Sequence, residues 1–194
     1  TASSPTRSVN IRMGTSTIAN NSSSLLTLAN GLGSRGTGTT STTSVTLGGT
    51  GNTILSGSVG PGAGAALALI KANAGTLTLS GNNSFTGGLA INAGTVTISA
   101  ATNTFSGGIA LSGATAGTRL NLNSTTALGA AASSLSISGG NNASIDNSSA
   151  GAITIANNNP QSWSSEFTFV GTRDLNMGTG NITLGGTRQI TASA

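Results

Sequence analysis

The chain has 194 residues, of which 36% are hydrophobic, 3% aromatic and 5% charged, with a formal net charge of +4. The seven basic residues form no run, whereas a nucleic-acid interface needs them gathered on one face, so we expect no nucleic-acid partner. Cys and His are absent, which excludes disulfides, thiolate metal sites and a Ser-His triad, and no apolar run is long enough for membrane insertion as a helix.

The N-terminal part, 1–60, carries short, irregular strand patterns. Val9, Ile11 and Met13 alternate with polar residues and predict a first strand. The next cluster of apolar residues begins at Leu25. The Gly-, Thr- and Ser-rich stretch 31–43 is expected to be a loop. Further strand patterns are found at 44–47 and 53–56.

The segment from Ala65 to Ala72 is open to two interpretations. Its length and bracketing residues allow a one-turn helix, whereas the alternation of Leu67 and Leu69 favours an extended run. We favour the extended interpretation.

A repeat begins at Gly75. Residues 75–80 (GTLTLS) match 94–99 (GTVTIS) at an offset of 19, and residues 84–91 (SFTGGLAI) match 104–111 (TFSGGIAL) at an offset of 20. Alternation of this kind puts the apolar residues on one face and the hydroxyls on the other, as in a strand. Repeats of this length made of strands predict an all-β parallel β-helix, or β-solenoid, of about 19–20 residues per coil.

The same rhythm continues to the end of the chain. An antiparallel sandwich or barrel is the competing architecture, but the two nearly equal offsets count against it. We therefore expect one domain over 1–194, with less regular coils in 1–60 and the repeat region in 69–191. The strand patterns after the repeat are 119–123, 134–138, 143–145, 152–155, 166–170, 174–177, 181–184 and 189–191.

Residues 75–95 resemble the autotransporter-associated β-strand repeat family, and the likeness covers roughly 69–191. The matching elements are Thr76–Gly81, Asn83, Phe85–Gly88 and Ala93–Thr95, and Lys71 stands where the family commonly has a Leu-x-Lys element. The resemblance implies a right-handed parallel β-helix in a secreted or surface-displayed bacterial protein, and hence an extracellular or cell-surface location. The family carries no shared catalytic motif, so the resemblance implies an architecture and no particular activity.

The residues themselves offer little chemistry. The only carboxylates are Asp146, Glu166 and Asp174, and a hydrolytic β-helix needs several of them clustered on one face. Calcium-binding nonapeptide repeats and phosphate loops are also missing. We expect no enzymatic activity, no cofactor, no metal and no small-molecule substrate. The one candidate ligand patch is Trp163 with Glu166, an aromatic ring and an acid of the kind that stacks on a sugar.

Two functional hypotheses remain open. In the first, the chain is an extracellular structural subunit that stacks head-to-tail into a homopolymeric filament, because a solenoid exposes an unpaired strand at each end. In the second, it is a fragment of an adhesin or autotransporter passenger that acts as a stalk or binding module. The residues expected at the polymer interface are Val9, Ile11, Met13, Arg188 and Ile190.

Overall fold

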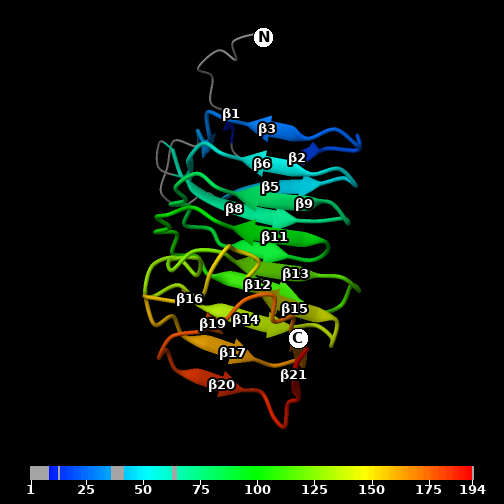
Figure 1. Ribbon diagram of the computed structural model, residues 1–194. Coiled ribbons are helices and arrows are strands. Elements are labelled where there is room, and N and C mark those ends of the chain that lie inside the picture. Colours follow the sequence, from blue (N-terminus) through cyan, green and yellow to red (C-terminus); the bar gives the residue numbers. More distant parts are fainter. Residues whose placement is uncertain (1–8, 13, 36–41, 63–64, 194) are drawn as a thin grey trace.

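The computed structural model describes residues 9–12, 14–35, 42–62 and 65–193. The regular structure of these residues consists of 21 short strands, without a helix, wound into a stack of coils (Figure 1). The strands are β1 (Val9–Ile11), β2 (Gly14–Ala19), β3 (Leu26–Leu28), β4 (Leu32–Ser34), β5 (Thr42–Gly48), β6 (Thr53–Leu55), β7 (Val59–Gly60), β8 (Ala66–Lys71), β9 (Thr76–Leu79), β10 (Leu89–Ile91), β11 (Thr95–Ile98), β12 (Ile109–Ser112), β13 (Arg119–Leu122), β14 (Leu135–Ser138), β15 (Ala143–Asp146), β16 (Ile153–Thr154), β17 (Gln161–Trp163), β18 (Phe167–Phe169), β19 (Leu175–Asn176), β20 (Ile182–Leu184) and β21 (Ile190–Ala192).

Two eight-stranded parallel sheets run along the stack. We name them sheet B, in the order β2-β5-β8-β10-β12-β14-β17-β20, and sheet C, in the order β3-β6-β9-β11-β13-β15-β18-β21. Each coil adds one strand to each sheet and then crosses a third face. The third face lies between the sheet C strand of one coil and the sheet B strand of the next. It contains two short sheets, β1-β4-β7 and β16-β19, and the isolated bridges Val59↔Asn83 and Asn83↔Asn103.

The predicted parallel β-solenoid is confirmed, but its uniform coil length is wrong. Paired residues are 19 apart between β9 and β11 and 20 apart between β8 and β10, as expected. Elsewhere the spacing rises to 26 between β12 and β14 and to 29 between β2 and β5. Only the strands must stack in register, so a coil accommodates extra residues in its corners.

The N-terminal coils differ from the prediction in their local structure. The segment 31–43, expected to be a loop, contains the buried strand β4 and the start of β5. A second strand, β2, begins at Gly14, and it is absent from the predicted elements. The extended interpretation of Ala65–Ala72 is correct, because β8 occupies Ala66–Lys71. Met13, assigned to the first strand, lies outside the described residues.

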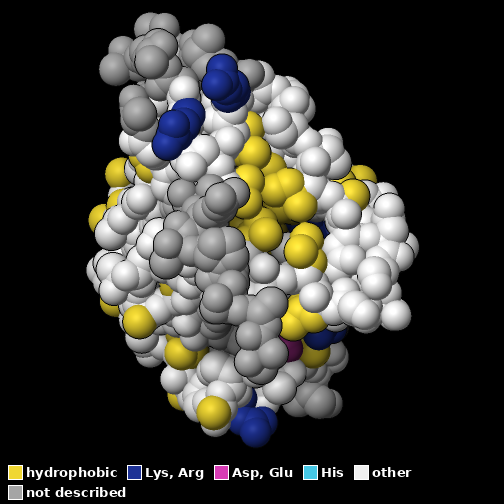
Figure 2. Space-filling view, turned by 90° about the horizontal axis from the view of Figure 1, so that it is seen from above, with side chains coloured by type: hydrophobic (Ala, Val, Ile, Leu, Met, Phe, Trp, Pro, Cys, Tyr) yellow, Lys and Arg dark blue, Asp and Glu magenta, His cyan; other side chains and the backbone are white. Residues whose placement is uncertain are grey.

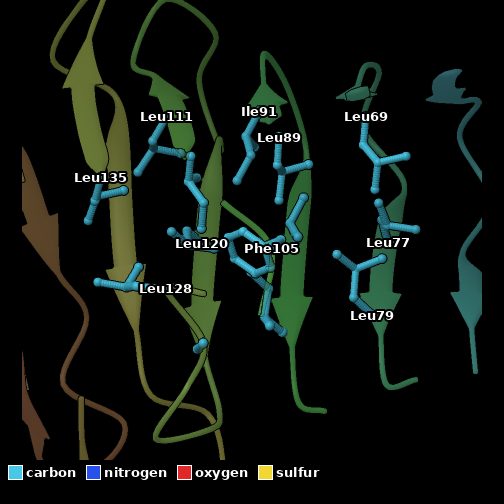
Figure 3. Packing of buried hydrophobic residues seen from close by; sticks show 14 of the residues in the cluster. Leu69, Leu77, Leu79, Leu89, Ile91, Phe105, Leu111, Leu120, Leu128 and Leu135 are labelled. Carbon is cyan, nitrogen blue, oxygen red and sulfur yellow. The ribbon is translucent and has the colours of Figure 1, made fainter. Parts of the chain in front are cut away.

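The strand alternation produces the core. In β9, Leu77 and Leu79 are buried while Thr76 and Thr78 are half-exposed, so the Thr-Leu-Thr-Leu sequence separates an inner from an outer face. Aliphatic side chains from both sheets fill the space between them (Figure 3). Each fully buried Leu or Ile contributes about 1.5–3 kcal/mol, so many similar contacts hold the stack together.

The most closely packed aromatic pair joins two repeats. The rings of Phe85 and Phe105 are stacked, with ring centroids 4.7 Å apart and an interplanar angle of 3°. Both side chains are fully buried. Their separation is one coil rise, so identical residues at equivalent positions stack face to face. The glycines that follow them serve close packing, since a Cβ on Gly107 would lie 2.1 Å from the backbone nitrogen of Gly88.

Candidate functional site

The C-terminal end of the stack exposes hydrophobic side chains. Ile182 and Leu184 on β20 are 45% and 52% exposed, and Ile190 on β21 is 43% exposed. The two β20 residues occupy core positions, because Ile182 pairs with Gln161 and Leu184 pairs with Trp163 on the neighbouring strand β17. The inner face of β20 therefore carries residues at core positions that no further coil covers among the described residues. The outer edges of β20 and β21 have no partner strand among the described residues.

A small apolar cavity lies beside this end. Its volume is about 130 Å³. The lining residues are Ile145, Trp163, Phe167, Phe169, Leu175, Met177 and Ile190. Small-molecule sites are usually about 300–1,000 Å³, whereas an apolar cavity of about 150 Å³ accepts a benzene-sized group, so this one has room for a single side chain.

The N-terminal end is the counterpart of this surface. Val9 and Ile11 on β1, Ile18 on β2 and Leu28 on β3 are partly buried against the core. Seen along the stack from this end, hydrophobic side chains gather in the middle of the face (Figure 2). Leu25, just before β3, is 54% exposed. Both ends of the described stack thus present apolar side chains beside a terminal strand edge.

The residues predicted for a polymer interface divide between these ends. Val9 and Ile11 lie on β1 at the N-terminal end, and Ile190 lies on the last strand, β21. Arg188 precedes β21, and its guanidinium donates to the carbonyl oxygens of Thr187 and Gly185 at 3.1 and 2.8 Å. Their role in association stays a prediction. Ile190 was among the residues predicted for the interface, whereas Ile182 and Leu184 were not. These two are exposed because β20 is the last strand of sheet B.

The structure places the predicted ligand patch near the last coils. We call a set of residues paired from strand to strand along one sheet a column. Trp163 lies in the inward column of sheet B between Ile137 and Leu184. Its ring packs edge-to-face on Phe167, with ring centroids 5.1 Å apart. Its indole nitrogen donates to Gln161 Oε1 at 3.2 Å. The backbone nitrogen of Glu166 donates to Asn141 Oδ1 at 3.3 Å. A ligand role for this pair stays a prediction.

Lys71, the single lysine of the chain, points into the interior. Its side chain is 3% exposed, in the sheet B column between Leu47 and Ile91. The ammonium donates to the carbonyl oxygens of Ala72, Asn73 and Ala93 at 2.8, 2.6 and 3.3 Å. Desolvation by burial lowers the pKa of Lys71 to about 8. The ammonium therefore links the corners of two successive coils, and no carboxylate of the described residues lies within ion-pair distance of it.

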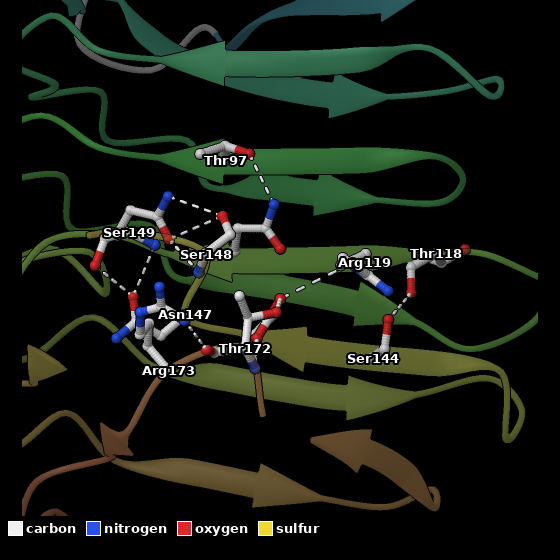
Figure 4. A network of polar contacts seen from close by, with 12 residues as sticks. Thr97, Thr118, Arg119, Ser144, Asn147, Ser148, Ser149, Thr172 and Arg173 are labelled. Atoms are coloured by element: carbon white, nitrogen blue, oxygen red, sulfur yellow. Dashed lines mark hydrogen bonds and ion pairs between the residues drawn. The ribbon is translucent and has the colours of Figure 1, made fainter. Parts of the chain in front are cut away.

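A second buried charge joins the coils further along, where Thr172 and Arg119 approach it (Figure 4). Asp146 is 1% exposed and accepts hydrogen bonds from the backbone nitrogen and the hydroxyl of Thr172, at 3.1 and 2.7 Å. Arg119 approaches the same carboxylate at 3.9 Å. The carboxylate thus attaches the loop before β19 to sheet C, and its oxygens are already engaged by groups of this chain.

Amides play a similar part on the third face. Asn83 and Asn103 are both 1% exposed, and Asn83 Nδ2 donates to Asn103 Oδ1 at 2.7 Å. Asn103 Nδ2 in turn donates to the carbonyl oxygen of Ala100 at 3.0 Å. Asn83 Oδ1 is buried without a hydrogen-bond partner among the described residues, because the preceding coil has Val59 at this position. The sequence suggested only corner residues here, whereas the structure has a short internal ladder.

The described part of the chain contains no group of three or more Asp, Glu, His or Cys side chains arranged to hold a metal ion. Within the same residues, no helix has the length and apolar character needed to cross a membrane.

Comparison with known proteins identifies the repeat region. Residues 69–98 and 93–115 match the family model described as passenger-associated-transport-repeat. No curated protein and no solved structure matches the chain significantly. The matched residues run from the end of β8 through β12, where the strand spacing agrees with the offsets of the sequence repeat. The predicted resemblance is thereby confirmed: residues 69–115 of this chain are similar to passenger-associated transport repeats.

Proposed function

We propose that this chain is a non-enzymatic, extracellular structural element of a bacterial passenger-type protein, and that its coils stack end to end into a surface filament. The observation that carries the proposal is the exposure of Ile182, Leu184 and Ile190 on β20 and β21, at positions that are in register with the core of the preceding coil. The repeat and the solenoid fit a passenger-type protein, which supports a secreted or surface-displayed location.

The distribution of polar chemistry supports a structural role. The buried charged and amide groups described above are satisfied mainly by corner carbonyls, by one another or by a neighbouring loop. A catalytic carboxylate has to stand free before a substrate, often beside a second one. Asp146 is instead enclosed, and Thr172 and Arg119 already engage its oxygens.

The open strand edges support stacking. Monomeric sheet proteins block such edges with charged residues, proline or bulges. β20 reads Ile-Thr-Leu and β2 reads Gly-Thr-Ser-Thr-Ile-Ala, without a charge or a proline in either. An end-to-end contact that does not close on itself makes a filament. A stalk within a longer passenger is the alternative, in which a neighbouring coil of the same chain covers each end.

The test is light scattering of the purified chain over a range of concentrations, followed by electron microscopy. Uniform filaments one solenoid wide are the expected result. Leu184→Asp buries a charge in the stacking contact and is expected to abolish them, while Thr183→Asp, on the outer face of the same strand, retains them. A folded chain that stays monomeric at the highest concentration contradicts the filament and leaves the stalk.

A further inference from the structure

We infer that the filament contact has one defined register, in which β20 and β21 of one copy pair in parallel with β2 and β3 of a second copy. The inference rests on the proposed function and adds to it the identity of the partner and the residues that meet. Its basis is the columns of side chains that run through sheets B and C.

The columns connect the two ends residue by residue. In sheet B, the inward column of Ile182 passes through seven pairings to Ser16, and that of Leu184 passes to Ile18. In sheet C, the column of Ala192 ends at Leu26. A second copy that continues the columns therefore places Ser16 on Ile182, Ile18 on Leu184 and Leu26 on Ala192.

Two of the three facing pairs of side chains are complementary in size. The large Ile182 meets the small Ser16, and the small Ala192 meets the large Leu26. Interdigitation of large and small residues fills a core without voids. A shift by one residue turns every inward side chain of the incoming strands to the outside, so register is strongly specified wherever one face is buried.

The order of faces agrees as well. The first described coil runs from the third face (β1) through sheet B (β2) to sheet C (β3), and the last runs in the same order through β19, β20 and β21. A second copy stacked on the C-terminal end therefore meets sheet with sheet on both long faces. Its β1 comes to the third face, beside the apolar cavity next to Leu175 and Met177. Val9 and Ile11 carry the aliphatic side chains of that strand.

Cysteine trapping tests the register directly, because the chain has no cysteine of its own. Thr17 and Thr183 are both exposed on the outer face, and their columns connect through sheet B. In the proposed register they are strand neighbours at about 4.8 Å, which lies within the Cα separation of about 4.4–6.8 Å that a disulfide requires. Thr15→Cys with Thr183→Cys is the matched control, offset by two residues to about 8 Å, beyond that range.

The double variant Thr17→Cys/Thr183→Cys is expected to give a ladder of covalent oligomers on mild oxidation, and the offset control to give none. An equal mixture of the two single variants is expected to give dimers only. Filaments without the Thr17–Thr183 bond, or with the offset bond in its place, overturn the register and leave the proposed function standing. Dimers from the Thr183→Cys variant alone show tail-to-tail contact and overturn the inference. Folded monomers that neither associate nor form a disulfide overturn the filament itself.

Discussion

The stability of this protein is expected to rise between pH 8 and pH 10.5, because of Lys71. In the folded chain its buried ammonium has a pKa of about 8, and in the unfolded chain the pKa returns to the ordinary 10.5. Between these values the unfolded state binds one proton more than the folded state, so the free energy of unfolding increases with pH. Below pH 8 both states carry the charge and the desolvation penalty is fully present.

The difference between the two pKa values sets the size of the effect. At about 1.4 kcal/mol per pH unit, it corresponds to a gain of about 3 kcal/mol by pH 10.5. The hydrogen bonds to Ala72, Asn73 and Ala93 act in the opposite sense, since carbonyl oxygens favour the charged form. They make this gain an upper value.

The composition leaves few other groups that could contribute to this pH dependence. With a single lysine and no Cys, His or Tyr, Lys71 is the one side chain with an ordinary pKa between 7 and 11. Urea unfolding at pH 7.5, 9 and 10.5 gives the change of the free energy of unfolding with pH. Lys71→Met is the control, because its free energy of unfolding is expected to be independent of pH. A wild-type profile as flat as that of Lys71→Met, or one that falls, refutes the reasoning. An NMR titration of the ¹³C-methylated amine gives the pKa independently.

Three further predictions concern stability and are measured by circular dichroism and urea unfolding. Leu79→Asp puts an unpaired charge at a fully buried site and is expected to prevent folding, while Thr78→Asp on the outer face is tolerated; equal damage contradicts the assigned faces. Phe105→Ala removes the stacked ring and is expected to cost about 3–5 kcal/mol, and a cost below about 1 kcal/mol contradicts its place in the core. Val59→Asn supplies a donor to the unpartnered Asn83 Oδ1 and is expected to cost less than Val59→Ala; the reverse order contradicts the extended ladder.

The repeat between Gly75 and Ile98 was predictable because each signal in it points to the same structure. The alternation of Thr76–Leu79 and Thr95–Ile98 assigned their faces, and the sequence offset between the two segments is their actual register. The same spacing does not extend to the whole chain, because a corner tolerates insertions that leave the strands stacked. The much wider separation of the paired residues Ile18 and Leu47 has no counterpart in a local sequence pattern.

The polar residues of the interior were beyond prediction for a different reason. Asn83 and Gln161 belong to residue types that are common in corners and on surfaces, yet they are 1% and 3% exposed. Their burial depends on which residue the neighbouring coil supplies, such as Asn103 for Asn83. Strand β17 was missed for this reason, since buried Gln161 interrupts the apolar alternation by which a strand is recognised.

The same dependence on a neighbouring coil applies at the two ends of the described stack, on which the proposed function rests. Every strand of sheets B and C pairs with a strand on each side, except the first and last strand of each sheet. Ile182 and Leu184 there lose the burial that their equivalents Leu135 and Ile137 have, both 0% exposed. Restoring it is worth about 25 cal/mol for each Å² of apolar surface covered, and it satisfies the free backbone groups of the edge at the same time. Under the proposed function a second copy of the chain supplies that coil, because an edge strand such as β20, without charge or proline, does not block pairing.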